Sequence, residues 1–146
     1  MGELAASGVL DRLELPVEAG GCRLAALPAV RRAVVTAPAE GVRFGVGLWL
    51  VEGDGEVDVS DAFAGLALEG PDAAAVLARL VPVDLDPAVF PAGAAVRTLL
   101  RHVPLVLVAS ERGFGLLVPR SYAASAVAEV VAAMRAVAAR REAGDA

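Results

Sequence analysis

Apolar and polar residues alternate in short segments along most of this chain, and this pattern predicts strands more often than helices. Segments with strand length and strand-like composition occupy residues 23–27, 32–36, 44–51, 56–60, 62–68, 95–100, 105–109 and 114–118. Gly53-Asp54-Gly55 and Glu111-Arg112-Gly113 are typical turn sequences between such segments. The short spacing of the last three segments predicts an antiparallel meander.

Two segments show helical spacing instead. Gly70-Pro71-Asp72 is a typical helix start, because proline at the first helical position has no amide hydrogen to leave unpaired. The apolar residues that follow on one face, before Pro82, are Ala73, Val76, Leu77 and Leu80. A longer helix is expected at 121–141, with Ser121 as N-cap. Its apolar stripe consists of Val127, Val130, Val131, Met134 and Val137. The element order predicts an α+β fold, with a mainly antiparallel sheet and two principal helices packed on one side.

A chain of 146 residues is long enough for one domain with a single core. Breakers at Pro16 and Gly20-Gly21 predict a loosely ordered segment over 1–22, followed by a single α+β domain over 23–141 and a frayed tail over 142–146. The chain has no run of about 18 apolar residues and no signal-peptide pattern, so neither a membrane span nor export is expected. We therefore expect a cytoplasmic protein.

The composition narrows the possible partners. All 13 basic residues are arginine, and the net charge is −5. An acidic chain does not form the basic stripe that neutralises phosphates, so nucleic acid is not an expected partner. The hydrophobic share of 57% is high for a soluble domain, which suggests a surface that another protein partly covers.

No complete catalytic motif is present. His102 is the single histidine, and Cys22 the single cysteine, so neither a disulfide within the chain nor a thiolate metal cluster is expected. Gly45 and Gly47 match half of a dinucleotide fingerprint, without the third glycine or a following helix. Gly53-Asp54-Gly55-Glu56 lacks the full ligand set and the distal glutamate of a calcium-binding EF-hand loop, and a turn explains it better. The acidic stretch of Asp54, Glu56, Asp58 and Asp61 is interpreted as a solvated strand edge. The residues therefore favour a binding or scaffolding role, without a catalytic, cofactor or metal site in this chain.

A candidate interface is indicated by arginines on or beside the predicted strands. Arg97, Arg101 and Arg120 each need an exit to solvent or a fixed partner, since a guanidinium remains charged. His102 and Tyr122 neighbour them in the sequence and complete the predicted interface. The final helix and the segment 90–101 are the expected docking surfaces, because both carry arginine beside apolar residues.

Several short motifs follow one another in an order that resembles a known family. They are Val57-Asp58-Val59-Ser60-Asp61, Leu68-Glu69-Gly70-Pro71-Asp72-Ala73, Val83-Asp84-Leu85, Phe90-Pro91-Ala92-Gly93, Arg97-Thr98 and Val118-Pro119-Arg120-Ser121-Tyr122-Ala123. From about Val57 onward the chain resembles the gamma subunit of heterotetrameric sarcosine oxidase. The N-terminal half departs from the family pattern, and Leu48-Trp49-Leu50 resembles a remnant of a longer strand region.

The resemblance implies a packing partner of larger flavoprotein subunits, which carry out the oxidative demethylation of sarcosine to glycine. FAD, FMN, NAD and tetrahydrofolate are then implied for the complex, and none for this chain. A more distant resemblance connects the chain to the folate-binding domain of aminomethyltransferases, whose Asp-Val-Ser-His motif has Asp61 in place of its histidine here. This implies a related fold without a working folate site.

Three alternatives remain open from the sequence. A stand-alone folate- or small-ligand-binding module predicts a pocket near 58–61. The small subunit of an N-methylglutamate dehydrogenase would share the same resemblance. A small enzyme that uses His102 predicts a cleft around that side chain.

Overall fold

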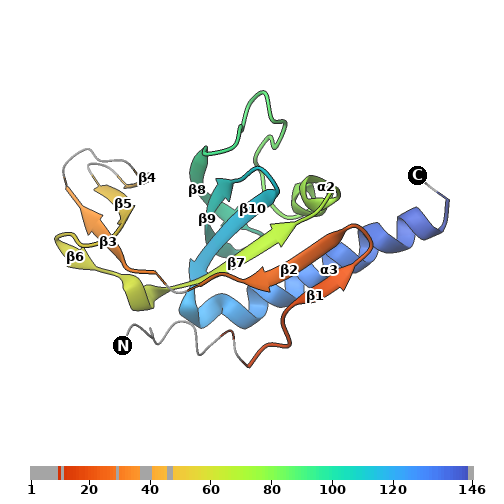
Figure 1. Cartoon of the computed structure of the whole chain (residues 1–146), viewed down its shortest axis with the longest axis horizontal. Coiled ribbons are helices and arrows are strands. Elements are labelled where there is room, and N and C mark those ends of the chain that lie inside the picture. Colours follow the sequence, from red (N-terminus) through yellow and green to blue (C-terminus); the bar gives the residue numbers. More distant parts are fainter. Residues whose placement is uncertain (1–9, 11, 29, 37–40, 46–47, 145–146) are drawn as a thin grey trace.

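The chain folds into two antiparallel sheets and two principal helices (Figure 1). The computed structural model describes residues 10, 12–28, 30–36, 41–45 and 48–144. The predicted α+β class with mainly antiparallel pairing is confirmed. Its division into two separate sheets was not predicted.

The larger sheet has six strands, which follow the order β1-β2-β7-β10-β9-β8. Every neighbouring pair is antiparallel. The strands are β1 (Val17–Ala19), β2 (Cys22–Ala26), β7 (Phe63–Glu69), β8 (Ala95–Leu100), β9 (Val103–Ala109) and β10 (Gly113–Pro119). The predicted meander of β8, β9 and β10 is confirmed.

The smaller sheet has the order β4-β5-β3-β6. Its strands are β3 (Arg32–Val35), β4 (Val42–Gly45), β5 (Leu48–Glu52) and β6 (Val57–Asp58). It is formed wholly between β2 and β7, which pair with each other in the larger sheet. The smaller sheet is therefore formed by the segment that connects β2 to β7. Figure 1 shows it at the end of the molecule away from the C-terminus.

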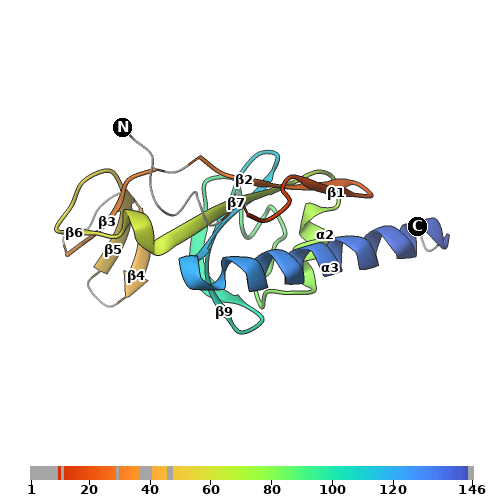
Figure 2. The same ribbon diagram turned by 90° about the horizontal axis from the view of Figure 1, so that it is seen from below.

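Both helices pack on one face of the larger sheet. α2 (Ala73–Ala78) and α3 (Ala123–Glu142) bury their apolar residues in a core shared with alternate residues of β7, β9 and β10. Figure 2 shows α3 running along the sheet. Short 3-10 turns, η1 (Ser60–Ala62) and η2 (Arg120–Tyr122), precede β7 and α3 respectively.

Several local predictions differ from the structure. The segment 44–51 was predicted as one strand, but it is divided between β4 and β5, which pair with each other. The segment up to residue 22 was predicted to be loose, but 17–19 form β1 against β2. α2 ends at Ala78, four residues before Pro82. Strand pairing across a turn, which local pattern does not report, explains the first two differences.

The start of α3 also differs from its prediction. Ser121 was expected to cap the helix, but it lies inside η2, and Tyr122 occupies the N-cap position without a side-chain hydrogen bond. The expected apolar stripe is confirmed, because Val127, Val130, Met134 and Val137 are buried. The tail was expected to fray from Glu142. Glu142 is the last residue of α3, and residues 145–146 lie outside the described part of the chain.

Candidate subunit interface

Two of the predicted interface residues form the tight turn between β8 and β9. Arg101 has a positive φ of 54°, and its amide donates a hydrogen bond to the carbonyl oxygen of Leu80 at 3.0 Å. Its Nε lies 2.9 Å from Oε1 of Glu129 on α3. His102 is exposed beside it. The turn therefore contacts α3 through this ion pair. An exposed ion pair of this kind contributes only about 0–1 kcal/mol to the free energy of unfolding.

Arg120 and Tyr122 lie at the same end of the larger sheet. Leu117 of β10 is opposite Val106 of β9, so residues after Pro119 approach the start of β9, where the turn of Arg101 and His102 is located. Tyr122 is 45% exposed and is one of four large apolar side chains this accessible among the described residues. Four of the five predicted interface residues are thus brought together by the antiparallel pairing.

Arg97 lies on the face of the larger sheet that the helices do not cover. It lies opposite Val106 in the β8–β9 ladder and lines a cavity of about 260 Å³. The cavity is also lined by Phe63, Pro104, Leu117 and Pro119. Arg97 therefore lies on the open face of the sheet, whereas Arg101 pairs with Glu129 of α3 on the other side.

The candidates for catalysis are not assembled into an active site. In the part of the chain that the structure describes, no group of three metal-ligating side chains occurs. His102 makes no ion pair with any described residue. Cys22 is buried, and burial together with the nearby Asp72 carboxylate raises the pKa of its thiol. A thiol with a raised pKa is a poor nucleophile, which fits a structural role.

The acidic residues near β6 satisfy local backbone groups. Glu56 accepts hydrogen bonds from the amide and hydroxyl of Thr36, and these bonds lower the pKa of its carboxyl. Asp58 accepts bonds from the hydroxyl and amide of Ser60, which lower the pKa of Asp58 in the same way. Residues 58–61 line none of the four cavities described for this chain. The described carboxylates of Glu56 and Asp58 thus serve the local backbone.

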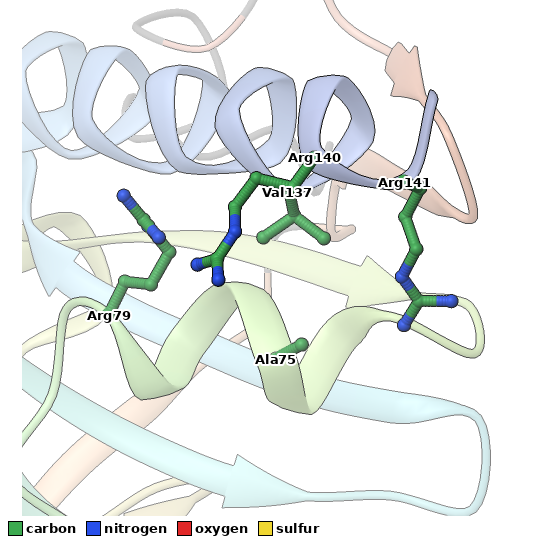
Figure 3. A pocket seen from close by; sticks show the side chains of 5 residues that line it. All are labelled: Ala75, Arg79, Val137, Arg140 and Arg141. Carbon is green, nitrogen blue, oxygen red and sulfur yellow. The ribbon is translucent and has the colours of Figure 1, made fainter. Parts of the chain in front are cut away.

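An arginine-lined groove lies between α2 and α3, and the sequence did not indicate it. Figure 3 shows Val137, Arg140 and Arg141 reaching from α3 toward Ala75 and Arg79 of the facing α2 segment. The groove encloses about 220 Å³. Nη2 of Arg141 lies 2.7 Å from Oδ1 of the buried Asp72. Three arginines therefore line the groove, and one of them, Arg141, is paired with Asp72.

α3 also presents an extensive outer surface. The segment Arg120–Glu142 has the length and composition of a membrane span, which the sequence pattern did not predict, and 28% of its most apolar window is buried. Seven of its residues pack into the core of the larger sheet: Ala123, Ala126, Val127, Val130, Ala133, Met134 and Val137. A buried stripe of this kind is typical of an amphipathic core helix. The remaining surface, rich in alanine, faces outward.

Comparison with known proteins places the fold. No family model matches the chain, and no curated protein matches it. Among solved structures, the chain is similar to a chain of the heterotetrameric sarcosine oxidase from Corynebacterium sp. U-96 in complex with pyrrole 2-carboxylate. The TM-score is 0.71 at 19% sequence identity, and the match covers 88% of this chain and 92% of that chain. The chain therefore has the fold of a subunit of heterotetrameric sarcosine oxidase.

Proposed function

We propose that this chain is the small, non-catalytic gamma-type subunit of a heteromeric, flavin-dependent sarcosine oxidase of the cytoplasm. The observation that carries this proposal is the similarity of nearly the whole chain to one chain of such an oxidase. The order of the motifs from Val57 to Ala123 supports the same role independently of the coordinates. The larger subunits would hold FAD, FMN, NAD and tetrahydrofolate and oxidise sarcosine to glycine, while this chain stabilises their assembly.

Two surfaces of this chain are suited to contact with those larger subunits. The first is the end of the larger sheet that carries Arg101, His102, Arg120 and the exposed Tyr122. Tyrosine and arginine are the residue types that most often dominate binding energy at interfaces. The second is the outer face of α3 with the arginine-lined groove. Its charge suits an acidic segment of the partner, because complementary charges speed and orient docking.

The test is co-expression of the tagged chain with the larger subunits encoded in its native genome, followed by affinity purification. We expect a yellow complex whose absorbance spectrum shows bound flavin and which oxidises sarcosine. If the chain elutes colourless and alone, the proposed function is wrong. If the complex forms but oxidises N-methylglutamate in place of sarcosine, the assembly role stands and the assigned substrate is wrong.

Charge reversal then locates the docking surface. Replacing both Arg79 and Arg140 with glutamate is expected to lower the yield of co-purified flavoprotein at least about tenfold, as is usual for the loss of paired interfacial charges. Arg43→Glu on β4 is the matched control, because Arg43 is exposed on the smaller sheet, away from the groove. Equal losses in both variants would mean that general electrostatics, and not this groove, governs assembly.

A further inference from the structure

Arg32 is a charged residue in an unusual position. It opens β3, and its side chain is 7% exposed, although guanidinium groups are seldom buried without a partner. Its backbone is held on both sides by the segment before β7. The Arg32 amide donates to Oγ of Ser60 at 2.9 Å, and the Arg32 carbonyl accepts from the amide of Val59 at 2.9 Å. The position of the side chain is therefore set by the fold.

The guanidinium of Arg32 has no ion pair among the described residues, within a limit of 4.0 Å. Glu52 lies directly opposite it in the β3–β5 ladder, but that carboxylate is exposed at the rim and does not close on the guanidinium. Burial lowers the pKa of Arg32, and the charge of Glu52 acts in the opposite direction. The guanidinium nitrogens still reach the solvent of the adjoining cavities, so an anion entering from solution can take the place of that water.

Arg32 lies at the junction of two adjoining cavities between the sheets, with volumes of about 370 Å³ and 240 Å³. Both are lined by Arg32, Glu52, Val108 and Leu117. We call the two cavities together the inter-sheet cleft. The first cavity is of the size that small ligands occupy in proteins. Most of the other lining side chains are apolar, among them Leu27, Val42, Leu50 and Phe114.

The floor of the cleft consists of small residues. Ala67, Ala95 and Gly115 lie on the face of the larger sheet that the helices do not cover. A Cβ added at Gly115 would meet its nearest atoms at 3.9 Å, which is ordinary van der Waals contact. The cleft is therefore open above Gly115, and a methyl group there is accommodated without strain.

From this arrangement we propose that the inter-sheet cleft binds a small organic monocarboxylate, with its carboxylate on Arg32 and its apolar body against Val108 and Leu117. The planar guanidinium matches a carboxylate through two parallel hydrogen bonds. A doubly charged phosphate suits the cleft less well, because a single guanidinium faces it and Glu52 repels it. The apolar lining supplies the remaining affinity by burial of the ligand body.

The experiment is a calorimetric and NMR titration of the full chain with 3-phenylpropanoate. We expect saturable binding with a dissociation constant below about 20 mM, and a shift of the Arg32 Nε–H resonance. The neutral amide, 3-phenylpropanamide, and inorganic phosphate are each expected to bind at least about tenfold more weakly, since neither offers a single carboxylate to the guanidinium. If the amide or phosphate binds as tightly as the acid, or no probe saturates, the proposal is wrong.

Substitutions of residues that line the cleft test whether the ligand binds there. Arg32→Gln is expected to weaken binding of 3-phenylpropanoate at least about tenfold, whereas Arg79→Gln, the same change in the groove between α2 and α3, should leave it unchanged. Gly115→Leu narrows the second cavity from its floor and should weaken binding, while Gly115→Ala should retain most of it. This pair keeps the test decisive if Arg32→Gln fails to fold. Retained binding in Gly115→Leu, or an equal loss in Arg79→Gln, would overturn the site.

Glu52→Gln tests the charge assigned to the ligand. Removing the neighbouring negative charge should strengthen binding of 3-phenylpropanoate about two- to fivefold, because a competing anion leaves the rim. Weaker binding in this variant would contradict a purely anionic ligand. The outcome does not depend on the proposed subunit role, because the titration requires no partner chain.

Discussion

The larger sheet and the smaller sheet differ sharply in how they are stabilised. The larger sheet and its helices share one continuous core, in which Leu66, Leu107, Leu116 and Val130 are fully buried. Among its described residues, the smaller sheet contributes the buried Leu50 and the partly buried Val34 and Val42 to a second cluster. The other buried members of that cluster, Phe63, Val106 and Leu117, belong to the larger sheet.

The difference shows that the smaller sheet depends on the larger one for its stability. A four-stranded sheet whose buried apolar residues, among those described, are Ala33 and Leu50 does not bury enough surface to fold alone. It is held instead by contact with the open face of the larger sheet and by polar bonds at its connection, such as those of Ser60. We therefore expect perturbations of the larger core to unfold the whole chain, and perturbations of the smaller sheet to act locally.

The largest effect is expected from Leu116→Ala. Leu116 is fully buried in the larger core, so its truncation leaves a cavity and should lower the free energy of unfolding by about 2–5 kcal/mol. Leu117 is its neighbour on the same strand and faces the smaller cluster. Leu117→Ala should cost about 2 kcal/mol or less, since its site is nearer solvent and can collapse. Urea denaturation followed by circular dichroism compares the two, and equal losses would contradict the distinction between the cores.

Two glycines with positive φ allow the same comparison at the backbone. Gly70 has a φ of +123°, and a Cβ there would overlap the carbonyl oxygen of Gly21. Gly70→Ala should therefore cost about 2 kcal/mol or more. Gly53 in the smaller sheet has a φ of +107° with no atom within 4 Å of an added Cβ. Gly53→Ala should cost only the conformational strain, about 1 kcal/mol, as thermal unfolding of both variants would show.

A smaller and local effect is expected from Ser60→Ala. The buried Ser60 hydroxyl accepts from the Arg32 amide and donates to Asp58 at 2.6 Å, so its removal leaves that amide unsatisfied, at about 1–3 kcal/mol. Hydrogen exchange should show loss of protection in β3 and β6 while β7 to β10 remain protected. Ser110→Ala is the control, because its exposed hydroxyl serves only the turn at Gly113. Loss of protection throughout the chain would contradict the local character of the smaller sheet.

The smallest expected difference between the two sheets is their response to acid. The folded-state pKa values of Glu56 and Asp58 lie below their ordinary values of 4.5 and 3.8, because both carboxylates accept hydrogen bonds. Their contribution to stability is therefore complete above those ordinary values and is lost as the pH falls through the lower, folded-state values. Amides of Thr36 and Ser60 should lose exchange protection at acidic pH before those of β10. Glu56→Gln should remove the pH dependence at Thr36 alone.

Much of the fold could be predicted because its signals are local. The three strands from 95 to 119 were recognised by short apolar segments with a turn between them, and both helices by their apolar stripes. The division of 44–51 into β4 and β5 was missed, because one uninterrupted apolar segment does not show where the chain reverses. β1 was missed because Val17–Ala19 is short and is stabilised by pairing with β2 rather than by its own pattern.

The candidate sites were predicted less completely than the fold. The turn of Arg101 and His102 and the η2 residues Arg120 and Tyr122 were named from their neighbours in sequence, and antiparallel pairing brings them to one end of the sheet. Arg32, Arg79 and Arg140 were missed as site residues. Each is an arginine like ten others in the chain, and only the packing of distant elements distinguishes a buried guanidinium from a solvated one.

By itself, the sequence determined the kinds of elements and most of their order, because hydrophobic periodicity and turn residues act over a few neighbouring positions. The tertiary structure alone decided that residues 32–58 leave the larger sheet to form a second one. It also decided that the two sheets enclose a cleft around Arg32. Both outcomes depend on contacts between residues far apart in the chain, and their energies come from mutual burial rather than from local conformational preference.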